Sequence, residues 1–216
     1  MILDVIKMNE TIQNTISFYV LCNKLKDTIR KGPLTWNVKR DRIESVAEHI
    51  YGTQMLAISI FYQFQYQLDL KRVLYMIAIH ELEEIEIGDL AFFETTEDEK
   101  KMMGKKATDY LLKDFLGKEE ISNRLDEYNE RKTEEAKFAY HCDKLECDLQ
   151  MKLYDQEGCV DLNHQENNPI MNDPRVKPLV DRESSFSNAW IEFDRAKYED
   201  DPNFIAIIDY LKNHTI

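Results

Sequence analysis

The chain of 216 residues is long enough for one sizeable domain, and a hydrophobic fraction of 43% is sufficient for a packed core. Its formal net charge of −13 argues against nucleic acid or an anionic membrane as the main partner. Glycine and proline are few, at six and five residues, which favours helices.

The first half of the chain is predicted to form three helices, at about residues 11–31, 45–65 and 70–87. In each of them apolar residues recur every three or four positions, which is the spacing of one helix face. Gly32-Pro33 is predicted to end the first helix, and Gly88 to end the third. The linker that follows the first helix contains Trp36 and several basic residues, Lys39, Arg40 and Arg42.

Further helices are predicted at about residues 96–116, 119–131, 133–155, 187–198 and 202–213. Asp201 is expected to cap the last of these, with Pro202 in its first turn. Residues 158–180 are polar and contain prolines, and they are predicted to be irregular. The expected fold class is all-α, with residues 1–216 as a single helical domain that ends in C-terminal helices over 181–216.

Signals for export and for disulfides are missing from the sequence. The N-terminus lacks the charged and apolar regions of a signal peptide, and no apolar run approaches the roughly 20 residues of a membrane span. The cysteines lack CxxC spacing, which predicts reduced core thiols at Cys22, Cys142, Cys147 and Cys159. The sequence is therefore typical of a cytoplasmic protein.

Three of the predicted helices place a group that can bind a metal ion on their apolar face. These groups are His49, His80 and Asp143, each three or four residues from apolar neighbours. A single core-facing histidine is usually structural, but an aspartate left charged and unpaired in the interior costs several kcal/mol. Two histidines and an aspartate that point inward together are predicted to bind a divalent cation.

The runs SVAEH, IHELEEIEIGDL and AKFAYHCDKLECDLQ resemble the HD-domain phosphohydrolases, especially the branch of small 5′-deoxynucleotidases. The resemblance is strongest over about residues 30–155. It implies an HD-domain helical bundle, here with a C-terminal helical extension, and one divalent metal ion bound by His49, His80, Glu81 and Asp143. The family has an aspartate where this chain has Glu81, which is longer by one methylene. Because successive helical residues splay by roughly 100°, His80 and Glu81 both reach the ion only if it lies off the shoulder of the helix.

Two imidazoles with one or two carboxylates form a mixed nitrogen–oxygen site that suits Mn, Co, Fe, Ni or Zn rather than Ca. Such an ion can lower the pKa of its water and polarise a phosphoryl oxygen. Glu84 and Gly88-Asp89 also match residues of the family. Glu84 is expected to hold the water or assist proton transfer, and Asp89 to take its proton or contact the sugar. The alternative for each side chain is a solvated carboxylate.

A nucleotide substrate also needs a cation that does not titrate, and the planar guanidinium of arginine suits a phosphate. The resembling family has an arginine shortly before the first metal histidine, often close to a tryptophan near the sugar. Arg30 is the expected match, and Trp36 is the candidate for the tryptophan. Arg42 is left open as an alternative to Arg30. The alternative role for Trp36 is a packing anchor under the linker.

The resemblance implies a metal-dependent phosphohydrolase that removes the 5′-phosphate from (deoxy)nucleoside monophosphates by attack of a metal-activated water. One alternative is another HD-type phosphoester hydrolase, acting on cyclic nucleotides or nucleoside triphosphates. Another is a non-catalytic metal- or nucleotide-binding module that is degenerate at Glu81. No dense cluster of lysines and arginines stands out, which disfavours a triphosphate. The expected partner is a small nucleotide, with no nucleic acid and no membrane, and a homodimer is left open.

Overall fold

The computed structural model describes residues 2–91, 93–165, 167–183 and 185–216, without the side chains of residues 2–6 and 97. Its first half contains α1 (Ile2–Cys22), η1 (Asn23–Lys26), α2 (Lys31–Thr35), α3 (Val46–Gln63), α4 (Leu70–Ile79), α5 (Glu84–Ile87) and α6 (Glu97–Leu111). The second half contains α7 (Lys118–Glu130), α8 (Glu134–Gln156), η2 (Leu162–His164), η3 (Pro169–Asn172), α9 (Lys177–Arg182), α10 (Phe186–Asp194), η4 (Arg195–Tyr198) and α11 (Pro202–Asn213). Apart from an isolated bridge between Ile29 and Ser45, the described ranges contain no strand pairing. The predicted all-α fold class is confirmed.

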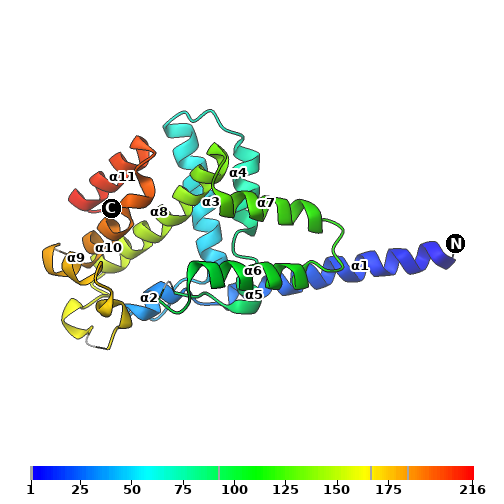
Figure 1. Cartoon of the computed structure of the whole chain (residues 1–216), viewed down its shortest axis with the longest axis horizontal. Coiled ribbons are helices and arrows are strands. Elements are labelled where there is room, and N and C mark those ends of the chain that lie inside the picture. Colours follow the sequence, from blue (N-terminus) through cyan, green and yellow to red (C-terminus); the bar gives the residue numbers. More distant parts are fainter. Residues whose placement is uncertain (1, 92, 166, 184) are drawn as a thin grey trace.

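The centre of the molecule is formed by α3, α4 and α8, which pack against one another (Figure 1). Their facing sides supply fully buried apolar residues such as Ala57, Ile77 and Leu145. Burying one large aliphatic side chain contributes about 1.5–3 kcal/mol relative to leaving it exposed. The C-terminal helices α10 and α11 cover α8 from the other side (Figure 1). The packing of these three helices therefore fixes the positions of the polar side chains that point inward from them, such as His49 and Asp143.

Local capping signals set several helix starts. Ser45 begins α3 in a capping box with Glu48, in which each side chain binds the backbone N–H of the other residue. Thr133 begins α8 by accepting a hydrogen bond from the backbone of Ala136. Asp201 caps α11 with Pro202 in its first turn, as predicted. These caps place the starts of the two longest central helices, α3 and α8, close to their predicted positions.

The first predicted helix was misplaced. A helix was expected over about 11–31, but α1 ends at Cys22, and the chain then tightens into η1 before the extended bridge at Ile29. Gly32-Pro33 does not end a helix but lies in α2. Pro33 is tolerated there because the backbone N–H groups of a first helical turn have no intrahelical partner. Apolar periodicity in 12–20 therefore identified the helix but not its boundaries.

The third predicted helix is broken in the middle. Instead of one helix over 70–87, α4 ends at Ile79 and α5 begins at Glu84. Between them the backbone tightens, with the N–H of Leu82 donating to Ile79 O at 3.0 Å and that of Glu84 to Glu81 O at 3.1 Å. Carboxylates at the C-terminal end of a continuous helix would oppose its macrodipole, whereas the break puts Glu84 in the first turn of α5. Gly88 ends α5 with a φ of 70°, as predicted.

The remaining predicted segments need smaller changes. The segment 158–180, expected to be irregular, contains the turns η2 and η3 and the start of α9. Its residues Ile170 and Val176 are buried against Trp36, so this segment adds to the core despite its polar composition. The last two predicted helices correspond to α10 with η4 and to α11.

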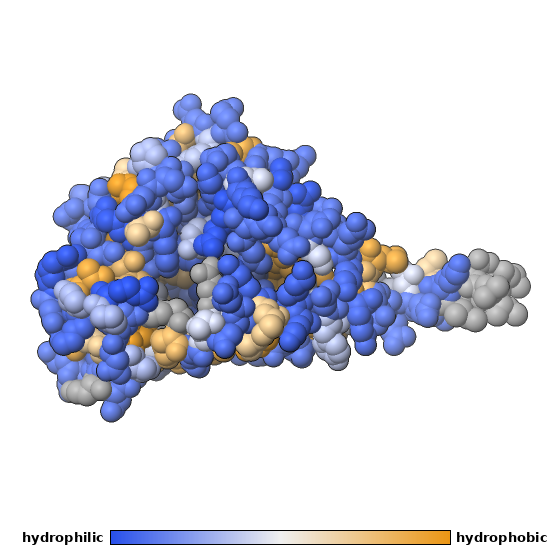
Figure 2. All heavy atoms as spheres, in the orientation of Figure 1, coloured by the Kyte–Doolittle hydropathy of each residue, from blue (hydrophilic) through white to orange (hydrophobic). Residues whose placement is uncertain are grey.

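The N-terminal helix α1 extends away from the rest of the molecule (Figure 1). Near its end, Phe18 and Cys22 pack beside Leu25 of η1. Among the side chains of α1 that the structure describes, five large apolar ones are exposed: Met8, Ile12, Ile16, Tyr19 and Val20. Part of this apolar surface is visible in Figure 2. Within the described ranges, none of the helices combines the length and the apolar character needed to cross a membrane.

Candidate metal centre and phosphate site

Four buried side chains from three parts of the chain converge on one point: His49 of α3, His80 and Glu81 after α4, and Asp143 of α8. One ligand atom from each of them lies within 4.8 Å of all the others. His49 Nε2 is 3.1 Å from Asp143 Oδ1, and His80 Nε2 is 3.5 Å from Glu81 Oε1. The structure thus brings together the residues predicted to bind the metal ion.

Both imidazole rings direct Nε2 into this cluster because Nδ1 is engaged elsewhere. His80 Nδ1 donates to Ile77 O at 2.8 Å, since a carbonyl can only accept. His49 Nδ1 donates to Glu146 Oε2 at 2.6 Å. In each ring the proton therefore belongs on Nδ1, and the lone pair of Nε2 is left for a cation. Neither Nε2 atom has a hydrogen-bond partner among the described residues.

The two carboxylate oxygens of Asp143 have different surroundings. Its Oδ2 accepts a hydrogen bond from Tyr128 Oη at 2.6 Å and lies 2.7 Å from Lys144 Nζ. Its Oδ1 is buried, faces both histidines and has no hydrogen-bond partner within the described part of the chain. Burial opposes the charge, but Lys144 and the two imidazoles outweigh it and hold the pKa of Asp143 well below its usual range. Asp143 is therefore an ionised ligand with one oxygen available.

Glu81 reaches the same point because the helix breaks. The tightened turn after Ile79 replaces the expected helical turn, so that Glu81 Oε1 lies 3.5 Å from His80 Nε2 and 3.8 Å from His49 Nε2. The expectation that an ion must lie off the shoulder of a continuous helix was wrong, because no helix is present at these residues. Burial opposes the ionisation of Glu81, but the positive charges of His80, Arg30 and Lys100 outweigh this effect and lower the pKa of Glu81 to about 2.

The donor set fits a transition-metal ion. Ligand atoms about 2.1 Å from one ion lie roughly 3.0–3.4 Å apart in octahedral or tetrahedral geometry. Of the four separations between a histidine nitrogen and a carboxylate oxygen, 3.1 Å and 3.5 Å are near this range, and the other two, of 3.8 Å, exceed it slightly. The site also favours positive charge. Burial and Arg30 oppose protonation of His49, but Cys147 and Asp143 outweigh them and raise its pKa well above the ordinary value.

Arg30 lies beside this cluster, as expected for the phosphate-binding arginine. Its Nη1 is 3.4 Å from Glu81 Oε1 and 3.6 Å from Asp89 Oδ2, and its Nη2 donates to Cys147 Sγ at 3.0 Å. Asp89 also accepts a hydrogen bond of 2.7 Å from the backbone N–H of Lys31. Arg30 and Asp89 thus form a polar edge on the metal cluster, close enough to contact a group bound there.

Glu84 is buried beside the cluster, and neither of its carboxyl oxygens has a hydrogen-bond partner among the described residues. Lys100 Nζ of α6 lies 3.6 Å from its Oε1. Burial, together with the carboxylates of Glu81 and Asp89, raises the pKa of Glu84 well above its usual value. A carboxyl group with a raised pKa can accept and return a proton near neutral pH.

The structure does not bring every candidate to the site. Trp36 is buried in a separate cluster, with its ring centroid 4.8 Å from that of Phe186 and 6.4 Å from that of Trp190. This placement favours the packing anchor over the sugar contact. Arg42 is largely exposed and pairs with Glu48, so Arg30 is the arginine at the cluster.

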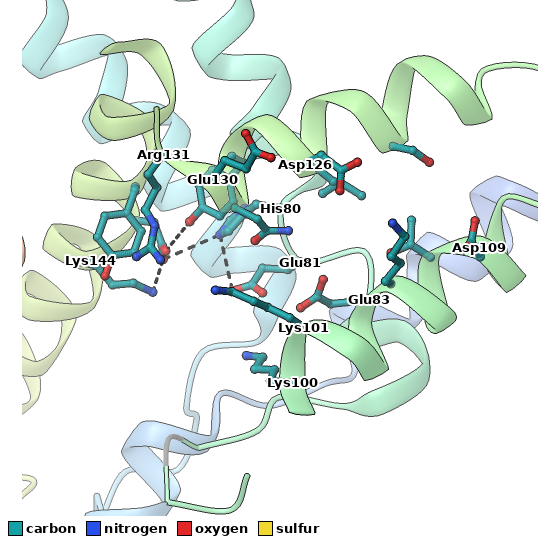
Figure 3. Close-up of a pocket in the computed structure, with 18 residues that line it drawn as sticks. His80, Glu81, Glu83, Lys100, Lys101, Asp109, Asp126, Glu130, Arg131 and Lys144 are labelled. Carbon is teal, nitrogen blue, oxygen red and sulfur yellow. Dashed lines mark hydrogen bonds and ion pairs between the residues drawn. The ribbon is translucent and has the colours of Figure 1, made fainter. Parts of the chain in front are cut away.

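A cavity of about 650 Å³ opens beside His80, Glu81 and Asp143. Five basic side chains line it, three from α6, one from the end of α7 and one from the middle of α8: Lys100, Lys101, Lys105, Arg131 and Lys144. Figure 3 shows Lys100 and Lys101 on one side of His80 and Glu81, with Arg131 and Lys144 on another. The sequence shows no dense cluster of lysines and arginines, and the fold brings these five together only from distant segments, with six carboxylates lining the same cavity: Glu81, Glu83, Asp109, Asp126, Glu130 and Asp143.

Two other functional candidates escaped the sequence interpretation. Glu146, which orients His49, follows Asp143 by three residues, a spacing that places both on one side of α8. Tyr128, which holds Asp143, lies on α7 and has no sequence signal that links it to the metal ligands.

Known proteins share both this sequence pattern and this fold. A family model described as HD domain matches residues 22–177. The 5′-deoxynucleotidase HDDC2 of Danio rerio is 31% identical over 149 residues, which are 67% of this chain and 72% of that protein. The protein of the same name from Homo sapiens is 28% identical over 157 residues, covering 70% and 71% of the two chains.

Solved structures resemble the fold along nearly all of the chain. A conserved hypothetical protein from Pyrococcus furiosus has a TM-score of 0.64 and 24% identity, covering 92% of this chain and 99% of its own. A predicted metal-dependent phosphohydrolase from Magnetospirillum magnetotacticum has a TM-score of 0.63 and 23% identity, covering 94% and 91%. Since the family model spans most of the residues that build the bundle, the chain belongs to the HD domain family.

Proposed function

We propose that this HD-domain protein is a metal-dependent phosphohydrolase that removes the 5′-phosphate from a deoxynucleoside monophosphate. The observation that carries this proposal is the convergence of three buried atoms without hydrogen-bond partners, His49 Nε2, His80 Nε2 and Asp143 Oδ1, beside the guanidinium of Arg30. The name of the similar HDDC2 proteins, 5′-deoxynucleotidase, supports the choice of substrate.

His49, His80, Glu81 and Asp143 would hold one divalent ion of the Mn, Co, Fe, Ni or Zn type. When bound, such an ion supplies Lewis acidity toward a water molecule and a phosphoryl oxygen. Arg30 binds the phosphate, because its guanidinium already lies among carboxylates at the edge of the cluster and can exchange one of them for a phosphate oxygen. Asp89 lies 3.6 Å from Arg30 and would orient its guanidinium, or contact the sugar of a bound nucleotide.

Glu84 acts as the general base that accepts a proton from the attacking water. The oxygen of water forms a bond to phosphorus while the bond from phosphorus to O5′ breaks, which yields inorganic phosphate and a nucleoside. The proton that the water loses passes to the carboxylate of Glu84, and O5′ takes a proton from a solvent water molecule as it leaves. Glu84 then returns its proton to the solvent, which restores both groups. Glu84 suits this task because its carboxyl oxygens are free of hydrogen bonds within the described structure and its pKa is raised.

A screen of phosphate release tests the proposal. Metal-loaded protein is incubated with deoxynucleoside and ribonucleoside monophosphates, a cyclic nucleotide and a nucleoside triphosphate, each with several added metals. Release from the deoxynucleoside monophosphates, lost in the His80→Ala variant, is the expected result. Release from the cyclic nucleotide or triphosphate alone would favour another HD-type phosphoester hydrolase. Metal binding without release from any nucleotide would favour the non-catalytic module.

We also propose that the chain acts as a single domain in the cytoplasm and pairs with a second copy through α1. Four unpaired cysteines agree with a reducing compartment. Four of the exposed apolar side chains of α1, Ile12, Ile16, Tyr19 and Val20, lie in a stretch, 11–23, that contains no charged residue in a chain of net charge −13. Two such chains repel each other over most of their surfaces, so an uncharged apolar helix is the favourable place for them to meet.

A further inference from the structure

Lys100 of α6 lies between the proposed general base and the cavity beside His80. Its Nζ is 3.6 Å from Oε1 of the buried Glu84, while 33% of the lysine side chain is exposed. The same side chain lines the cavity together with three of the residues that would hold the metal ion, His80, Glu81 and Asp143 (Figure 3). Lys100 therefore faces Glu84 on one side and the space next to the metal cluster on the other.

The packing of α6 against α5 places Lys100 beside Glu84. Thr96 caps the start of α6, and the backbone N–H of Lys100 donates to the Thr96 carbonyl at 2.9 Å. Gly104 lies one turn further on the same face of the helix, where an added Cβ atom would come within 2.8 Å of the Glu83 carboxylate. Glycine at this position leaves room for α6 to approach Glu83 and Glu84. A helix cap and the contact between two helices thus fix where Lys100 lies.

The ion pair between Lys100 and Glu84 is a loose one. Within the described part of the chain, no group accepts a hydrogen bond from Lys100 Nζ, and both carboxyl oxygens of Glu84 also lack hydrogen-bond partners. In the neighbouring pair, by comparison, Lys144 Nζ lies 2.7 Å from Asp143 Oδ2. Burial opposes the charge of Lys100, but the carboxylates of Glu81 and Glu84 outweigh it and raise the pKa of Lys100. Lys100 is therefore a cation whose N–H donors are available to a bound anion.

Arg30 and Lys100 act on the same two carboxylates. Arg30 Nη1 lies 3.4 Å from Glu81 Oε1, and burial of Glu81 is outweighed by the charges of His80, Arg30 and Lys100, which lower its pKa. Burial and nearby carboxylates raise the pKa of Glu84, and Lys100 and Arg30 reduce this effect. Lys100 lines the cavity but Arg30 does not, so the two cations reach these carboxylates from different directions. An anion that binds beside Glu81 can therefore contact both cations.

We propose that Lys100 is a catalytic residue that binds the transferred phosphate together with Arg30. The proposal rests on the phosphohydrolase function proposed above and keeps its substrate, a deoxynucleoside monophosphate. As a metal ligand, Glu81 would share its negative charge with the ion, which leaves Arg30 and Lys100 free to bind the phosphate instead. Cations that contact the oxygens of a transferring phosphoryl group stabilise the charge that develops on them. Lys100 keeps its proton throughout, so the proton transfers through Glu84 and the solvent are unchanged.

The competing role for Lys100 is to neutralise Glu84 and nothing more. The Glu84→Gln variant separates the two roles, because no charge is left at residue 84 to be neutralised. Titration calorimetry measures the binding of inorganic phosphate to this metal-loaded variant, with and without the second substitution Lys100→Gln. Loss of the lysine should weaken phosphate binding about tenfold, the factor for one charged hydrogen bond.

Two further variants in the same Glu84→Gln background serve as controls. Lys100→Arg keeps the positive charge and should retain most of the affinity for phosphate. Lys106→Gln removes a charge from α6 at a residue that does not line the cavity, and it should leave the affinity unchanged. Circular dichroism and the metal content of each sample verify that the variants fold and hold the ion.

Equal affinity for phosphate with and without Lys100→Gln would overturn the proposal. Phosphate release from deoxyadenosine 5′-monophosphate by the wild-type protein is measured in parallel. Normal release, with a phosphate affinity that does not depend on Lys100, counts against the role of this residue alone. No release from any nucleotide, with an affinity that does depend on Lys100, supports the phosphate contact and counts against the phosphohydrolase function instead.

Discussion

His49 Nδ1 lies 2.6 Å from Oε2 of Glu146, and both side chains are buried. This contact sets the ring so that its other nitrogen faces His80, Glu81 and Asp143. Gly52, one turn further along α3, leaves the space for it, because a Cβ atom there would come within 2.5 Å of Glu146 Oε1. A carboxylate that accepts from a metal-binding histidine fixes the orientation of the ring and raises its basicity.

We therefore expect Glu146→Gln to weaken metal binding about tenfold, the lower end of the usual effect of such partners. Gly52→Ala should act in the same direction by displacing Glu146, while Glu157→Gln, at an exposed position of the same chain, serves as the control. Competitive metal titration measures the affinity, and circular dichroism verifies the fold. An affinity unchanged in both variants would show that the contact does not orient the ligand.

Purified protein is expected to bind one transition-metal ion per chain. His49→Ala and Asp143→Ala should abolish this binding, because each removes one of the four ligand atoms that converge on the site. His164→Ala is the control, since His164 is exposed and pairs with Asp161 far from the site. Elemental analysis after reconstitution gives the stoichiometry. Failure of the wild-type protein to bind any of the candidate metals would remove the proposed site.

Whether Glu81 binds the metal ion separates the hypothesis of an enzyme from that of a non-catalytic module. Because its Oε1 lies near both histidines, Glu81→Ala should weaken metal binding, and Glu81→Asp should retain the ion with a modest change in activity. Metal titrations of the wild type and both variants measure the difference. Indifference to Glu81→Ala would mean that this carboxylate pairs with Arg30 rather than with the ion.

Glu84→Gln should keep the metal ion but lose activity by a factor of about 10²–10⁴, as is typical for groups that transfer a proton or stabilise charge. Glu86→Gln is the matched control on α5, because Glu86 is exposed and lies 3.5 Å from Lys24. Metal content and the rate of phosphate release are measured on the same samples. A variant with a normal rate would exclude Glu84 from the proton transfer.

The pairing of two chains through α1 is tested by light scattering. Ile12→Glu combined with Ile16→Glu should convert a dimer into a monomer, because the substitutions place charge on the exposed apolar side of the helix. Gln13→Glu combined with Ser17→Glu adds the same charge on neighbouring exposed positions and should leave the dimer intact. A wild-type protein that is monomeric at all concentrations would contradict the pairing.

Several features of this protein followed from local sequence. Apolar residues at a spacing of three and four predicted α3 and α8, since burial of one helix face dominates their stability. His49, His80 and Asp143 could be selected because a polar group on such a face requires a partner in the interior. Asp201 and Pro202 marked the start of α11, because capping depends on a few adjacent residues.

Other features depended on contacts between distant segments. The break after Ile79 was not predictable from periodicity, because the apolar spacing continues through it while buried partners decide whether the backbone tightens. The cavity beside His80 has no local sequence signal, since Lys105 and Arg131, which both line it, are far apart in the chain. Trp36 illustrates the same limit, because its partners Phe186 and Trp190 come from the C-terminal helices.

Local sequence was enough to predict the helical class, the Asp201 cap and the residue types of the metal site, since these depend on local periodicity and on the chemistry of single side chains. Which atoms face the metal site follows from the packing of the helices, because that depends on partners supplied by distant segments. Glu146 of α8 orients the His49 ring by accepting a hydrogen bond from its Nδ1. Tyr128 of α7 binds Oδ2 of Asp143, so that only Oδ1 of this carboxylate can bind a metal ion. Such directions are set by packing over long sequence separations, which no local pattern encodes.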